Sequence, residues 1–233
     1  MKKLLCIMCC GILTTSLGII KVSANEGEVE TIPDGFDSAE QYEQVPDYYD
    51  AERIEARNEK YAKANQILKQ RKNVYSISLP LRAQQDRYWC AAAVGEMIID
   101  YQLGSDNIWT QAKIAKQMKT DATGAYVDDQ ATALRQITGL NFEVTRLSDY
   151  SFANALRADI NSYVGLSLPV NLYYIYSSSG TAYHSLAAKG YSDANTVIFL
   201  DPWVYDSSRY GQHEISISQM TTAIDKAFGI YIW

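Results

Sequence analysis

Cys90 is the residue of this sequence best suited to nucleophilic chemistry. Three alanines follow it, and the pattern predicts a helix that begins at about Cys90, runs to Leu103 and is ended by Gly104. The unpaired N–H groups and the positive dipole at a helix N-terminus favour a thiolate. Because the thiolate is the reactive form of cysteine, Cys90 is a candidate nucleophile. The alternative is a small buried cysteine with no chemistry.

The chain has two histidines, and His184 is the better partner for such a thiolate. It lies at the start of a predicted strand, and Asp201 ends the next predicted strand after one hairpin turn. Antiparallel pairing would let the Asp201 carboxylate accept from one ring nitrogen, so that the other faces the thiol. Trp203 would shield that hydrogen bond from water. His213, in a polar stretch, is interpreted as a surface residue and is the alternative base.

Upstream of Cys90, Gln84 offers an amide N–H that can stabilise an oxyanion formed beside the thiolate. Its neighbour Gln85 is the alternative donor, since the two glutamines are adjacent. No paired Cys and His spacing typical of a zinc site is present, so we expect neither a metal nor a cofactor.

The order of these residues resembles the papain-like cysteine peptidase superfamily. A glutamine precedes the helical cysteine, a histidine opens a strand, and a carboxylate is followed two positions later by tryptophan. The bacterial branch that removes double-glycine leaders from bacteriocins is the most similar. The resemblance covers roughly residues 76–233 and implies four roles: oxyanion donor for Gln84, nucleophile for Cys90, base for His184 and orienting residue for Asp201.

Two features depart from the families that this chain resembles. Trp89 precedes the cysteine, whereas in papain a tryptophan follows it. The bacteriocin-leader branch is usually fused to a transporter and works inside the cell, whereas residues 1–24 of this chain are predicted to be an export signal. A double-glycine leader therefore cannot be assumed to be its substrate.

Residues 1–24 have the pattern of a secretory signal peptide: two lysines, an apolar run and small residues up to Ala24. The run is short and interrupted for a membrane anchor. We therefore expect a secreted or cell-surface protein with no membrane segment in its mature form. Three of the four cysteines lie in this segment, which leaves Cys90 alone and excludes an internal disulfide in the mature chain.

Residues 25–73 form an acidic, partly helical segment, with a predicted helix at 50–69 that ends in a basic patch. Two interpretations remain open. One is a solvated leader between the signal and the domain. The other is a pro-segment that inhibits its own enzyme until it is cut near the basic patch, which would make the protein a zymogen.

Residues 74–233 are predicted to form one α+β domain of papain-like architecture. A helical half, with the nucleophile at a helix N-terminus, packs on a C-terminal antiparallel sheet, and a cleft lies where they meet. Helices are expected at about 90–103, 109–118, 128–138, 149–163 (capped by Ser148) and 217–227. Strands are expected at about 76–81, 141–147, 169–177, 183–189, 196–200 and 230–233.

Composition limits the classes of partner. Of the 233 residues 47% are hydrophobic and 21% charged, which suits a folded core, and the net charge is -6. An acidic protein does not suit nucleic acid, whose binding depends on clustered Lys and Arg. We expect a monomer that acts on protein or peptide. Two other hypotheses are a thiol-dependent transferase, deamidase or cell-wall amidase, and an inactive surface-binding module.

Overall fold

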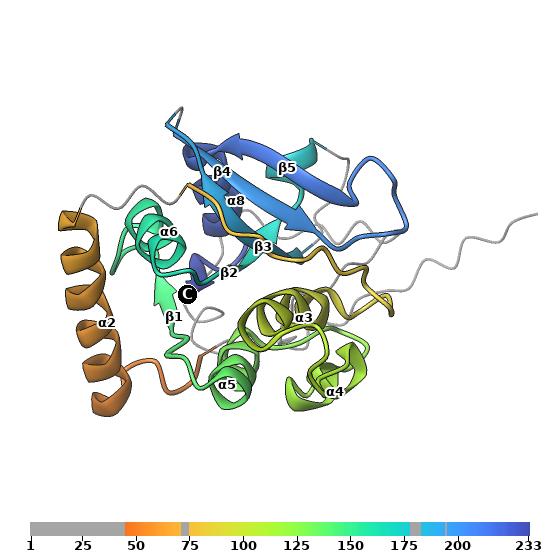
Figure 1. Cartoon of the computed structure of the whole chain (residues 1–233), viewed down its shortest axis with the longest axis horizontal. Helices are drawn as coiled ribbons and strands as arrows, with labels where there is room; N and C mark the ends of the chain where they lie inside the picture. The colour runs from red at the N-terminus through yellow and green to blue at the C-terminus, as the bar shows by residue number, and fades with distance from the viewer. Residues whose placement is uncertain (1–44, 71–74, 178–182, 194) are drawn as a thin grey trace, which may run out of the picture.

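The computed structural model describes residues 45–70, 75–177, 183–193 and 195–233. The predicted signal peptide and most of the acidic segment before the first helix lie outside the described residues. In the described part, helices precede and flank a six-stranded sheet with strand order β1-β6-β2-β3-β4-β5 (Figure 1). Every strand pairing in this sheet is antiparallel. The prediction of an α+β fold is confirmed.

The helical half is built around α3 (Cys90–Leu103), which is buried over most of its length. It packs against α4 (Gln111–Gln117) and α5 (Val127–Thr138). Gly95 allows this close approach, because a Cβ atom there would lie 2.7 Å from the Met118 Cε atom and 3.1 Å from Ile114 Cγ2. The predicted helices at these three places are confirmed, with ends that differ by at most a few residues.

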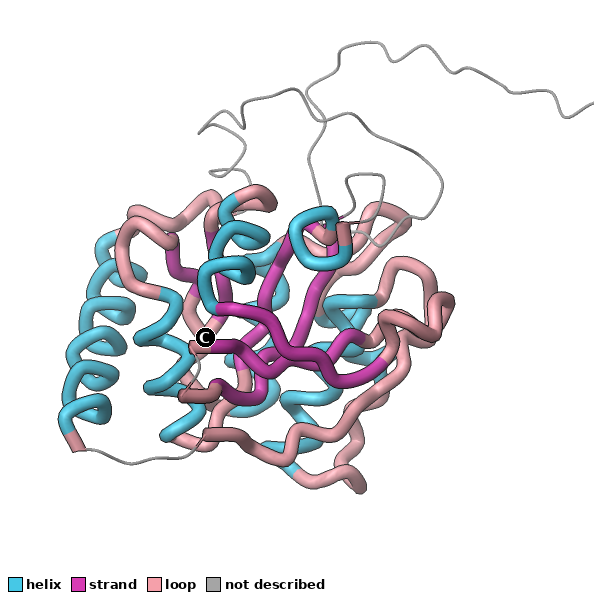
Figure 2. The backbone as a smooth tube through the Cα atoms, turned by 90° about the horizontal axis from the view of Figure 1, so that it is seen from above, coloured by secondary structure: helices cyan, strands magenta, loops and turns pink. Residues whose placement is uncertain are grey.

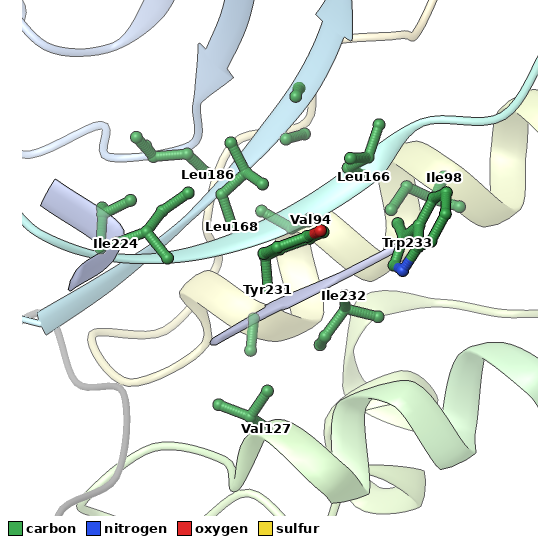
Figure 3. Packing of buried hydrophobic residues seen from close by; sticks show 14 of the residues in the cluster. Val94, Ile98, Val127, Leu166, Leu168, Leu186, Ile224, Tyr231, Ile232 and Trp233 are labelled. Atoms are coloured by element: carbon green, nitrogen blue, oxygen red, sulfur yellow. The ribbon is translucent and has the colours of Figure 1, made fainter. Parts of the chain in front are cut away.

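The sheet consists of β1 (Val144–Arg146), β2 (Leu166–Asn171), β3 (Tyr183–Tyr191), β4 (Thr196–Asp201), β5 (Gly211–Ser216) and β6 (Ile230–Ile232). Its central strands β2 and β3 are buried at almost every position. Helices α3, α6 (Phe152–Asn161) and α8 (Ile217–Asp225) pack on them. Figure 3 shows this core, where Val94 and Ile98 of α3 meet Leu166 and Leu168 of β2. The sheet is therefore a rigid support for any residue that its strands present.

Two strand predictions for the sheet were wrong, and one strand was missed. The segment predicted as a strand at 169–177 leaves the sheet after Asn171, whose side chain accepts from the Tyr173 N–H at 3.1 Å and starts the short helix α7 (Tyr173–Tyr176). At 76–81 there is only an isolated bridge between Ser76 and Gly190. Strand β5 was missed because it is polar and only half-buried.

One helix start differs from its prediction, and another agrees with it. Helix α6 begins at Phe152 with Ser151 as its N-cap, so Ser148 does not cap it. The first described helix, α2 (Ala51–Lys69), agrees with the helix predicted in the acidic segment.

Helix α2 packs along α6 and lies at the left edge of the molecule in Figures 1 and 2. The Tyr61 ring stacks against Tyr150, at 4.7 Å, and against Trp233, at 5.9 Å, and these two rings also stack on each other at 5.1 Å. Arg53 makes a 2.9 Å ion pair with Asp128 of α5. Aromatic stacking and an ion pair thus hold α2 against the rest of the domain. No helix in the described ranges combines the length and apolar character needed to cross a membrane.

Candidate active site

Cys90 is the first residue of α3, and its side chain is completely buried. The run of alanines after it favours helix, and Trp89 occupies the N-cap position. The thiol therefore lies at the end of the helix where unpaired N–H groups and the dipole favour an anion. Cys90 forms no disulfide within the described part of the chain.

His184 and Asp201 are joined by a buried hydrogen bond. The register of β3 and β4 pairs Ala187 with Leu200, so that Asp201 at the end of β4 lies beside the start of β3. Nε2 of His184 lies 2.7 Å from Oδ1 of Asp201, and both side chains are fully buried. The hairpin thus brings these two residues together as the sequence predicts.

The His184 side chain also interacts with Cys90. Burial on its own would lower the pKa of His184, but the Asp201 charge, the hydrogen bond to Asp201 and the interaction with the Cys90 side chain raise it to about 9. Burial likewise opposes ionisation of Asp201, but the charge of His184 and the hydrogen bond from it lower the pKa of Asp201. At neutral pH the pair is therefore an imidazolium and a carboxylate.

Both oxygens of Asp201 have partners. Oδ1 also accepts from the Trp203 backbone N–H at 2.9 Å, and Oδ2 accepts from the Tyr176 hydroxyl at 2.8 Å. Nε of Arg209 lies 3.6 Å from Oδ2. The Trp203 ring meets the edge of the His184 ring at 89°, with centroids 6.0 Å apart, and is itself buried. Aspartate suits this position better than asparagine. An asparagine amide nitrogen in place of Oδ2 would face two hydrogen-bond donors, the Tyr176 hydroxyl and Arg209.

Sequence reasoning missed Tyr176 and Arg209. The sequence pattern predicts Tyr176 inside a strand at 169–177, but Tyr176 belongs to α7, which follows the turn at Asn171. Burial and the neighbouring charge of Asp201 raise the pKa of Tyr176, so the hydroxyl stays protonated and donates. The sequence carries no signal for either contact, because both depend on tertiary packing.

Gln84 is buried and held beside the end of β4. Its backbone N–H donates to the Pro202 carbonyl at 2.9 Å, and its side-chain Nε2 donates to the Arg87 carbonyl at 2.7 Å. Oε1 of Gln84 is buried with no hydrogen-bond partner in the described chain. The Gln85 side chain, in contrast, is exposed. Of the two candidate glutamines, the interior position therefore belongs to Gln84.

His213, the alternative base, lies on β5. Its ring stacks on Phe199 with centroids 5.5 Å apart, meets the edge of Tyr176, and hydrogen bonds through Nε2 to the Arg209 carbonyl. None of these partners is Cys90. The described ranges also contain no group of three or more His, Cys, Asp or Glu side chains placed to hold a metal ion.

Comparison with known proteins identifies the family of the chain. The model of the Peptidase_C39 like family matches residues 76–223, which is more than half of the chain. The chain belongs to the Peptidase_C39 like family. This membership makes it a cysteine peptidase and confirms its resemblance to the papain-like, double-glycine peptidase branch.

Among solved structures, this Peptidase_C39 like protein is similar to the peptidase domain of Streptococcus ComA, a bifunctional ABC transporter involved in a quorum-sensing pathway. The two share 15% identity over 66% of this chain and 96% of the ComA domain, with a TM-score of 0.44. No curated protein matches this Peptidase_C39 like chain.

Proposed function

We propose that this cysteine peptidase is exported and hydrolyses peptide bonds of extracellular proteins or peptides, with Cys90 as nucleophile. His184 is the acid and base, Asp201 orients it, and Gln84 stabilises the oxyanion. The observation that carries the proposal is the buried hydrogen bond of 2.7 Å between His184 and Asp201, with Cys90 on the same imidazole. A buried thiol, an imidazole beside it and a carboxylate bonded to that imidazole match the requirements of a thiolate nucleophile and its base.

In the first half of the reaction, the Cys90 thiolate attacks the scissile carbonyl carbon. The carbonyl oxygen becomes an oxyanion, stabilised by the Cys90 backbone N–H and the Gln84 amide. An amide nitrogen carries two hydrogens, so Nε2 of Gln84 retains one after its bond to the Arg87 carbonyl. His184 gives its proton to the amine as the C–N bond breaks, which leaves a thioester on Cys90.

In the second half, the neutral His184 takes a proton from water, whose oxygen attacks the thioester. The C–S bond breaks, a carboxylic acid is released, and the thiolate and imidazolium form again. Asp201 stays ionised throughout and stabilises the imidazolium. The buried Trp203 ring keeps water away from the bond between His184 and Asp201.

For α2 the contacts favour a structural role over an inhibitory one. Its side chains bond to α5, β1 and the segments beside them: Arg53 to Asp128, Lys60 to the Asn141 carbonyl, and Tyr61 to Thr145 at 3.3 Å. Figure 1 shows the loop that leads into α3 on the opposite side of the molecule from α2. We therefore propose that residues 45–70 remain part of the active enzyme.

A digest of a proteome-derived peptide library, read by mass spectrometry, tests the proposed function. The native protein is expected to create new carboxyl termini under reducing conditions, and Cys90→Ala is expected to create none. Amine-conjugated or deamidated products without new termini would indicate a transferase or a deamidase instead. No change in the library, together with binding to it, would contradict hydrolysis and favour the binding module.

A further inference from the structure

Gln111, the first residue of α4, is completely buried beside the segment that carries Gln84. Its Nε2 donates to the Ala83 carbonyl at 3.0 Å, and its Oε1 accepts from the Gln85 backbone N–H at 2.7 Å. A single side chain therefore binds the backbone on both sides of Gln84. Neither bond involves the Gln84 side chain, whose Nε2 donates to the Arg87 carbonyl.

The second hydrogen on Nε2 of Gln111 has a partner as well. Nε2 of Gln111 also donates to Oε2 of Glu96 at 2.8 Å. Glu96 belongs to α3, the helix that begins with Cys90. Gln111 thus connects the backbone around Gln84 to the helix of the nucleophile. Both hydrogens of its amide, and its oxygen, are used in these three bonds.

A third backbone anchor acts on Gln84 itself, whose N–H donates to the Pro202 carbonyl at 2.9 Å. Pro202 follows Asp201 in the chain. The backbone from Ala83 to Gln85 is therefore fixed between α3 and the end of β4, the two elements that carry Cys90 and Asp201. Moving it would leave buried polar groups without partners, which is costly.

We propose that Gln111 is a positioning residue that sets the Gln84 amide at the place where the oxyanion forms. The inference rests on the proposed role of Gln84 as oxyanion donor. An oxyanion donor stabilises the transition state only if it is already in place when the charge develops. A misplacement of about 1 Å in such a site can reduce the rate about 100-fold.

Two reactions of Cys90 separate this role from general support of the fold. Peptide hydrolysis passes through an oxyanion, whereas alkylation by iodoacetamide forms a C–S bond as iodide leaves and makes no oxyanion. Gln111→Met fills a similar volume but can neither donate to the Ala83 carbonyl nor accept from Gln85. We expect it to lower kcat for the best-cleaved library peptide about 10- to 100-fold. KM and the pH dependence of alkylation are expected to stay unchanged.

The full chain with Gln84→Ala, Gln111→Met and both changes together completes the test. We expect Gln84→Ala alone to lower kcat about 100-fold, and the double variant to lose little more than Gln84→Ala, because Gln111 acts through Gln84. Gln111→Leu provides a second variant if the methionine disturbs folding. Its apolar side chain can neither accept from Gln85 nor donate to Ala83, so the same loss in kcat is expected.

Gln130→Met is the matched control. Gln130 is also a completely buried glutamine, and it bonds to the Ser167 hydroxyl and the Ala125 carbonyl, far from Gln84 in the chain. The Gln130→Met variant is expected to leave kcat for the same peptide unchanged.

Three results would be decisive against parts of this account. If Gln84→Ala keeps full kcat, the proposed role of Gln84 is wrong. If Gln84→Ala loses kcat but both Gln111 variants keep it, Gln84 stands and the positioning role of Gln111 is wrong. If alkylation slows in proportion to hydrolysis in the Gln111 variants, Gln111 supports the fold or the thiol, and the inference is overturned.

Discussion

Asp201→Asn should reverse the ionisation of His184. The asparagine oxygen can still accept from His184 and from the Trp203 N–H at the position of Oδ1, but the negative charge is lost. Its amide nitrogen would face the Tyr176 hydroxyl and Arg209, two donors, at the position of Oδ2. The substitution keeps the volume, so the measured effect reports charge and donor geometry.

The size of the change follows from the opposing influences on the pKa of His184. Burial lowers this pKa, whereas Asp201 and, more weakly, Cys90 raise it, with a result of about 9 against an ordinary value of 6.5. Without Asp201 only the weaker influence of Cys90 opposes burial, so the pKa of His184 is expected to fall well below 9. Loss of the whole elevation from 6.5 to about 9 would correspond to about 3 kcal/mol.

Stability against pH gives an independent readout of the same change. A protonated His184 stabilises the native chain fully below pH 6.5, the pKa in the unfolded state, and this contribution is lost as the pH rises towards about 9. The native protein should therefore lose stability in this window. In Asp201→Asn the pKa of His184 is expected to lie closer to its unfolded-state value, so this loss of stability should be much smaller there.

The assay is an NMR titration of the His184 ring, paired with urea unfolding across the same window. Asp206→Asn is the matched control, because Asp206 bonds to Ser208 on the same loop and not to His184. A His184 pKa that stays near 6.5 in the native protein, or that does not change in Asp201→Asn, would refute the reasoning.

Three further predictions concern the surroundings of the site. Tyr176→Phe removes a hydrogen bond to the Asp201 carboxylate and should lower the free energy of unfolding by about 1–2 kcal/mol in urea at neutral pH; an unchanged midpoint would count against this contact. Tyr61→Ala removes the stacking of α2 on Trp233 and should cost about 2 kcal/mol, measured as a lower Tm. Activity should not rise in that variant, whereas a rise would favour an inhibitory pro-segment. Gly95→Val should cost about 1–3 kcal/mol, since its Cβ meets a side chain at 2.7 Å, and an unchanged Tm would show that the helices can separate freely.

The parts of the site that local signals specify could be predicted from the sequence. The alanines after Cys90 and the stop at Gly104 define α3, and one hairpin is enough to bring His184 to Asp201. Because each of these signals lies within a short stretch of chain, no knowledge of the tertiary packing was needed.

The remaining parts depend on contacts between distant segments. Tyr176 reaches Asp201 only because Asn171 ends β2 and turns the chain into α7. Gln84 and Gln85 are indistinguishable as adjacent glutamines, and only tertiary contacts, among them the bonds from Gln111 and from the Pro202 carbonyl to this backbone, separate a buried from an exposed side chain. These contacts depend on the tertiary fold, so neither residue propensity nor sequence spacing predicts them.

The most direct test of the central claim is alkylation of Cys90 by iodoacetamide across pH, followed by intact mass, in the native protein and in His184→Ala. The account predicts fast alkylation of the native protein well below neutral pH and a sharp slowing without His184, as a thiolate paired with an imidazolium requires. Alkylation of the native protein only above about pH 8, as for a free thiol, or equal rates in the two proteins would contradict it.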